Sequence, residues 1–105
     1  MTQFDDREKA FEKKFELDEE VEFKLSVRST RLFARWAAGQ MGFSAADSEA
    51  YEIRLGDSIV VMPGHGHVIA AVERDFAAKG IFLSRHRLEK EMSECEDLAR
   101  RSADQ

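Results

Sequence analysis

Residues 2–24 read TQFDDREKAFEKKFELDEEVEFK, a stretch with the charge density of a solvent-exposed helix. It also contains three aromatic residues at the spacing i, i+7 and i+11: Phe4, Phe11 and Phe15. Residues with this spacing share one face of an α-helix. Further along the chain, Asp18 and Glu22 interrupt this face before it becomes apolar again. The pattern predicts one long helix whose second half packs against the protein while its first half presents phenylalanines to another surface.

The first helix is expected from about Asp5 to Gln40, with Leu25, Leu32 and Trp36 as its apolar stripe in the second half. Glycines at 39 and 42 end it, and position 42 suits a left-handed residue after a helix. A second helix is expected to start at the cap residue Ser44 and to stop at Pro63. Within it, residues 59–61 (IVV) are also compatible with a short strand.

Two further helices complete the predicted fold. Residues 66–79 place Ile69, Val72 and Phe76 on one face, with a glycine directly after the end. The last helix opens at Ser84, and its apolar face is formed by Leu88, Met92, Cys95 and Ala99. The sequence therefore predicts an all-α protein, a small four-helix bundle with a long first helix and a mobile amphipathic N-terminal arm. We assign residues 1–20 to the arm and residues 21–105 to the bundle.

Composition limits the classes of function. A chain of 105 residues has room for one modest core. Its net charge of −5 argues against nucleic acid as the main ligand, because phosphate binding needs a cationic surface. No apolar run approaches the roughly 20 residues of a membrane span, and the N-terminus lacks the apolar segment of a signal peptide. The single cysteine fits a reducing cytoplasm. We expect a cytoplasmic protein without direct membrane insertion.

The phenylalanine arm has two readings. In the first, its three phenylalanines cover the protein's own core. In the second, they bind a partner, because residues 1–20 hold eight acids and four bases beside only four large apolar side chains. Burying three phenylalanines yields roughly 5–9 kcal/mol, and ordering about 15 residues costs at least as much. We favour an amphipathic helix that is marginal alone and becomes firmly helical in a partner's groove.

A row of basic residues follows the arm. Lys24, Arg28, Arg31 and Arg35 are spaced 4, 3 and 4 residues apart and form a stripe on the predicted helix. The simplest interpretation is a solvated face that pairs in part with acids of the second helix, namely Asp47, Glu49 and Glu52. The alternative is a secondary docking patch for an acidic protein surface or a nucleotide phosphate.

No active site is evident in the sequence. His65 and His67 make an incomplete metal site, and a polar loop is the better interpretation. Cys95 lies on the apolar face of the last helix, where it is expected to fill the core. No nucleophile motif or glycine-rich phosphate loop is present. We predict a protein that is not an enzyme and has no catalytic, metal or cofactor site, with weak nucleotide binding left open.

Five segments of the first helix are distinctive: residues 4–15 (FDDREKAFEKKF), 18–20 (DEE), 23–24 (FK), 31–32 (RL) and 36–38 (WAA). Together they resemble the ATPase-inhibitor zeta subunit family of alphaproteobacterial F-type ATP synthases. The resemblance is dense over residues 3–43 and thins to scattered positions beyond them. It implies a four-helix bundle with a mobile N-terminal segment, whose activity is to bind the catalytic head of the synthase and stop ATP hydrolysis.

The resemblance also implies a mechanism. The arm would insert between the catalytic alpha and beta subunits, with gamma as a further candidate partner, and the bundle would stay outside. The phenylalanines would supply most of the buried area, and charge pairs of the flanking residues would set the register: Asp5, Asp6, Arg7, Glu8 and Lys9. The protein would then sit on the inner face of the cell membrane, peripheral to the synthase. The alternative is a diverged helical adaptor or ligand-sensing protein that kept the bundle and lost the inhibition.

Overall fold

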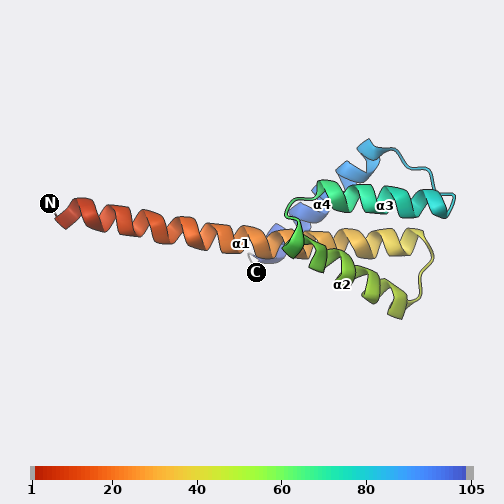
Figure 1. Ribbon diagram of the computed structural model, residues 1–105, viewed down its shortest axis with the longest axis horizontal. Helices are drawn as coiled ribbons and strands as arrows, with labels where there is room; N and C mark the ends of the chain where they lie inside the picture. Colours follow the sequence, from red (N-terminus) through yellow and green to blue (C-terminus); the bar gives the residue numbers. More distant parts are fainter. Residues whose placement is uncertain (1, 104–105) are drawn as a thin grey trace.

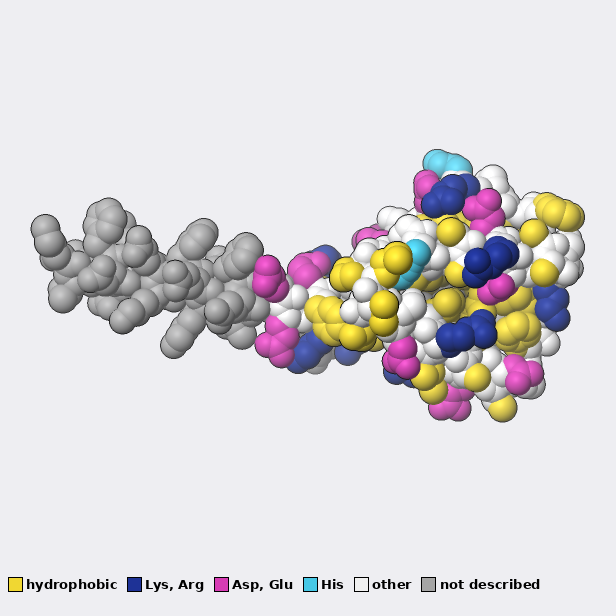
Figure 2. Space-filling view, in the orientation of Figure 1, with side chains coloured by type: hydrophobic (Ala, Val, Ile, Leu, Met, Phe, Trp, Pro, Cys, Tyr) yellow, Lys and Arg dark blue, Asp and Glu magenta, His cyan; other side chains and the backbone are white. Residues whose placement is uncertain are grey.

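The computed structural model describes the backbone of residues 2–103 and the side chains of residues 19–102. Over these residues the chain forms four helices and no strand: α1 (Thr2–Gln40), α2 (Ala45–Val61), α3 (Gly66–Ala78) and α4 (Arg85–Ala103). The predicted all-α bundle is confirmed. The other three helices gather around the second half of α1, and its first half extends beyond them (Figure 1). Charged side chains are spread over the outer surface of the bundle (Figure 2).

The helix ends lie close to their predicted positions. After α1, the Phe43 amide donates to the Ala38 carbonyl at 3.0 Å and the Gly42 amide to the Gly39 carbonyl at 3.2 Å. This pair of bonds requires a left-handed residue at position 42, where φ is +75°. Ser44 caps α2 by accepting a hydrogen bond from the Asp47 amide at 3.2 Å. The local turn chemistry therefore sets where α1 ends and where α2 begins.

Residues 59–61 are helical, so the strand interpretation was wrong. They belong to the last turn of α2, and Ile59 is buried in the core. Gly56 lies within α2 although glycine is a weak helix former. α2 passes close to α1 at this position. A Cβ at position 56 would lie 3.0 Å from Arg31 Cγ and 3.8 Å from Val27 Cγ1. Glycine therefore serves here to let the two helices approach.

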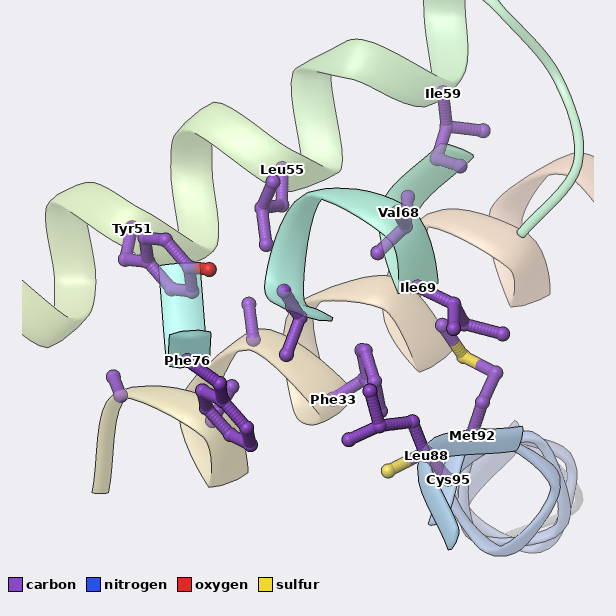
Figure 3. Close-up of a cluster of buried hydrophobic side chains, with 14 residues drawn as sticks. Phe33, Tyr51, Leu55, Ile59, Val68, Ile69, Phe76, Leu88, Met92 and Cys95 are labelled. Atoms are coloured by element: carbon purple, nitrogen blue, oxygen red, sulfur yellow. The ribbon is translucent and has the colours of Figure 1, made fainter. Parts of the chain in front are cut away.

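The core lies between α1 and the other helices (Figure 3). Phe33 of α1 is fully buried near the centre. Around it lie three sets of side chains: Tyr51, Leu55 and Ile59 from α2, Val68, Ile69, Val72 and Phe76 from α3, and Leu88, Met92 and Cys95 from α4. The predicted apolar faces of α3 and α4 are thus confirmed.

The buried face of α1 differs from the predicted stripe. Leu25 is buried as expected, but Leu32 and Trp36 are only half-buried. The fully enclosed positions of α1 are Ser29, Thr30, Phe33, Ala34, Ala37 and Ala38. These positions span about half of the helix circumference, since α1 has α2 on one side and α4 on another. Five of these six residues are small, which lets the neighbouring helices approach α1, and Phe33 is the large side chain that fills the core between them.

Thr30 provides a test of this packing. It is fully buried and its Oγ1 makes no hydrogen bond within the described protein. Thr30→Val replaces the hydroxyl by a methyl group of similar size, so we expect the free energy of unfolding to rise by about 1 kcal/mol in urea denaturation. Ser29→Ala is the control, because Ser29 Oγ donates to the Ser26 carbonyl at 3.1 Å. That change should lower stability, and a loss in both variants would contradict the assignment.

Cys95 tests the packing of α4. It is buried, and burial, reinforced by the charges of Glu91, Glu94 and Glu96, raises the pKa of the Cys95 thiol to about 11. At pH 8 the folded protein should react with a thiol-specific disulfide reagent at least about 100-fold more slowly than the denatured chain, because its thiolate fraction is smaller and access is blocked. Equal rates in the folded and denatured chains would show that this face of α4 is open to solvent.

Candidate partner-binding surfaces

The predicted arm residues lie outside the described side chains. This applies to all eight candidates: Phe4, Asp5, Asp6, Arg7, Glu8, Lys9, Phe11 and Phe15. Their partner-binding role therefore stays a prediction, as does the division of the chain at residue 20. The backbone of α1 is one continuous helix through this region. Its first half has no neighbouring helix (Figure 1), and the side chains from Glu19 to Lys24 are all exposed.

The predicted basic row forms one side of a surface groove. Its four residues lie together along a groove of about 490 Å³, which is lined by Lys24, Val27, Arg28, Arg31, Leu32, Arg35 and Glu52. We call this feature the basic groove. Its lining combines four cationic side chains with two apolar ones and a single acid. Such a lining fits a ligand that carries negative charge beside apolar groups.

Ion pairs within the basic groove engage only part of its charge. Arg35 Nη2 lies 3.1 Å from Glu52 Oε1, and Arg35 Nε donates to the same oxygen at 3.2 Å. Glu52 is buried, so this pair neutralises the charge of a carboxylate at the edge of the core. Lys24 pairs with Glu20 at 3.3 Å across one turn of α1. Arg28 and Arg31 form no ion pair with any described acidic side chain. They are therefore the charges of the groove that remain for a partner.

The sequence interpretation of the basic row was right in part. Of the three acids proposed as partners, only Glu52 pairs with the row. The apolar members of the basic groove were missed, because Leu32 was assigned to the apolar stripe of the helix and Val27 was given no role. Gly56 is the signal that could have located them. A glycine within α2 indicates close approach by another element, and the Arg31 side chain passes over it.

His65 links three helices, so the interpretation as a polar loop residue was incomplete. Its Nδ1 lies 3.0 Å from Glu96 Oε1 of α4. Its Nε2 lies 3.2 Å from Ser26 Oγ and 3.3 Å from Ser29 Oγ, both on α1. The ring therefore ties the start of α3 to α1 and α4. No local pattern announces these contacts, because the partners lie 31 to 39 residues away in sequence.

Further polar contacts in the bundle are structural. The Tyr51 hydroxyl donates to Asp75 Oδ2 at 2.8 Å and joins α2 to α3. Burial, followed by this hydrogen bond and the charge of Asp75, raises the pKa of the Tyr51 phenol above its ordinary value. Among the described residues, no cluster of three or more potential metal ligands occurs. None of the helices, as far as the structure describes them, is apolar enough over a sufficient length to cross a membrane.

Comparison with known proteins identifies the family. No curated protein and no solved structure matches the chain. The sequence model of the family described as ATPase inhibitor subunit zeta matches residues 1–102. The match covers the arm, the basic groove and nearly all of the bundle. The chain therefore belongs to the ATPase inhibitor subunit zeta family.

Proposed function

We propose that this chain is a regulatory subunit that binds the catalytic head of the F-type ATP synthase and inhibits ATP hydrolysis. In this proposal the N-terminal amphipathic helix inserts at an interface between the catalytic alpha and beta subunits. The gamma subunit is a further candidate partner of this helix. The bundle stays outside as an anchor. The protein has no chemistry of its own and acts from the cytoplasm, on the inner face of the cell membrane where the synthase is held.

One observation carries the proposal: the family match includes the arm, and no other described helix runs beside the backbone of the arm. α4 ends near Glu22, since Arg100 Nη1 lies 3.4 Å from Glu22 Oε1. N-terminal to that level, α1 has no neighbouring helix (Figure 1). A helix segment that carries three phenylalanines at the spacing of one face, and whose backbone has no neighbouring helix among the described residues, is suited to a groove on another protein.

Energetics favour insertion over a free-standing arm. Three buried phenylalanines contribute roughly 5–9 kcal/mol, which is close to the cost of ordering the segment. The continuous backbone of α1 reduces that cost, because the bundle already nucleates the helix. In the complex, Phe4, Phe11 and Phe15 would fill apolar pockets of the cleft, and the charged residues from Asp5 to Lys9 would fix the register. A wedge of this kind blocks the opening and closing of a catalytic interface.

The arm can be tested by removing two of its phenylalanines. Phe4→Ala combined with Phe11→Ala should raise the concentration needed for half-inhibition of ATP hydrolysis by about 100-fold or more, because most of the buried area is lost. The measurement uses the purified catalytic head from the same cell and the full chain. Phe82→Ala is the matched control, since Phe82 is an exposed phenylalanine at the other end of the bundle.

Thermal unfolding of the same variants distinguishes the two readings of the arm. If the arm phenylalanines were core residues, each change to alanine would cost about 3–5 kcal/mol of stability. We expect a negligible change instead. Full inhibition by the double variant would contradict the insertion mechanism. Binding of the unmodified chain without inhibition would identify the alternative, a diverged adaptor that docks on the synthase.

The basic groove is proposed as the secondary docking patch. Lys24, Arg28, Arg31 and Arg35 lie on the same helix as the arm, a few turns from it. In a protein with a net charge of −5, this local cationic surface orients the molecule toward an acidic surface of the partner. The groove would therefore contribute to the rate of association and to its dependence on salt.

Arg28→Glu tests this role without disturbing internal pairs, because Arg28 forms no ion pair with a described residue. We expect about 5–10-fold weaker binding to the catalytic head at low salt and a smaller salt dependence, since one attractive charge becomes repulsive. Lys90→Glu is the control, because Lys90 is exposed on α4 away from the groove. Equal effects of the two changes would indicate a response to net charge alone and would contradict a docking role for the groove.

A further inference from the structure

An unusual apolar surface lies where α1 leaves the bundle. Three consecutive residues at the end of α2 are exposed: Val60 by 67%, Val61 by 87% and Met62 by 57%. Phe23 of α1 is also 44% exposed. A run of exposed apolar residues costs solubility and is kept in proteins mainly for function. We call these four residues the apolar collar.

The register between α1 and α2 places Val60 close to the level of Phe23. The two helices run antiparallel (Figure 1), and a Cβ at Gly56 would lie 3.0 Å from Arg31 Cγ and 3.8 Å from Val27 Cγ1. Val60 lies one turn further along α2, beside the turn of α1 that runs from Phe23 to Val27. The space-filling view shows hydrophobic side chains gathered at this place, directly beside the point where α1 extends from the bundle (Figure 2).

The collar continues into the basic groove. Val27 lines the groove and lies beside Gly56 of α2. Lys24, which also lines the groove, directly follows Phe23 in sequence. The collar and the groove therefore form one surface, apolar at the base of the arm and cationic along its side. An apolar centre with a charged border is the usual composition of a protein–protein interface.

Resting on the proposed function, we propose that the collar and the groove form one anchoring surface that packs against the catalytic subunit gripping the arm. The partner surface would carry exposed aliphatic or aromatic side chains flanked by aspartate or glutamate. Phe23 lies four residues beyond Glu19, about 6 Å along the helix. A subunit that holds residues 1–19 therefore also reaches the collar, so the anchor is continuous with the arm.

A second copy of this chain is the less suitable occupant. In a two-fold dimer the same surface meets itself, which would bring the arginines of one groove close to those of the other. Arg28 and Arg31 form no ion pair with a described acid, so nothing described would offset this repulsion. Charge complementarity favours an acidic heterologous partner.

The test changes the collar in the full chain. Val60→Asp combined with Val61→Asp should weaken binding to the purified catalytic head by about 10-fold or more, measured by calorimetry, because the apolar contact is replaced by desolvated charge. Phe23→Ser on α1 is an independent variant with the same expected direction. Phe82→Asp is the control, as Phe82 is 84% exposed at the opposite end of the bundle. Circular dichroism of each variant establishes that the fold is retained.

The outcomes separate the collar from the proposed function. If the collar variants bind like the unmodified chain while Phe4→Ala with Phe11→Ala abolishes inhibition, the collar is not an anchoring surface. The proposal that the arm inhibits ATP hydrolysis is then retained. If the unmodified chain does not bind the head, the proposed function fails. If sedimentation reveals a dimer that the collar variants dissociate with head binding unchanged, the occupant is a second copy and the proposal is wrong.

Discussion

Close packing along the second half of α1 supports the rest of the molecule. Ala34, Ala37 and Ala38 are fully buried, and their short side chains let neighbouring helices approach the α1 backbone. α2 and α4 pack mainly against α1, and α3 packs on α4 and, to a smaller extent, on α1. The three shorter helices therefore share a single support. A large residue at any of these alanines would separate α1 from a neighbour and disturb the whole core.

This arrangement makes one helix serve two purposes. The second half of α1 is the centre of the fold, and the same unbroken helix leads into the arm. α4 ends near Glu22, where Arg100 meets that residue. The contacts of the bundle with α1 thus stop close to the C-terminal end of the arm. In the proposed complex, a partner subunit takes over the role that α2 and α4 play further along the same helix.

The sequence predicted the elements better than the surfaces. Helix ends followed from local chemistry, as at Gly42, Ser44 and Gly80, because capping and left-handed turns depend on residues close in sequence. The buried face of α1 was misplaced because Leu32 and Trp36 were taken as its centre, whereas the enclosed side of the helix carries mainly small residues around Phe33. The contacts of His65 and the shape of the basic groove depend on residues far apart in sequence. No periodicity within one helix could reveal them.

The division between arm and anchor has a physical advantage in the proposed mechanism. An arm whose burial energy nearly equals its ordering cost binds weakly by itself. A modest contact at the collar or the groove holds that arm near its cleft, and the second contact then forms as an intramolecular step at high effective concentration. Because both contacts lie on α1, only a short length of helix separates them. Two weak surfaces on one helix can therefore give a stable inhibitor, and loss of either contact weakens it.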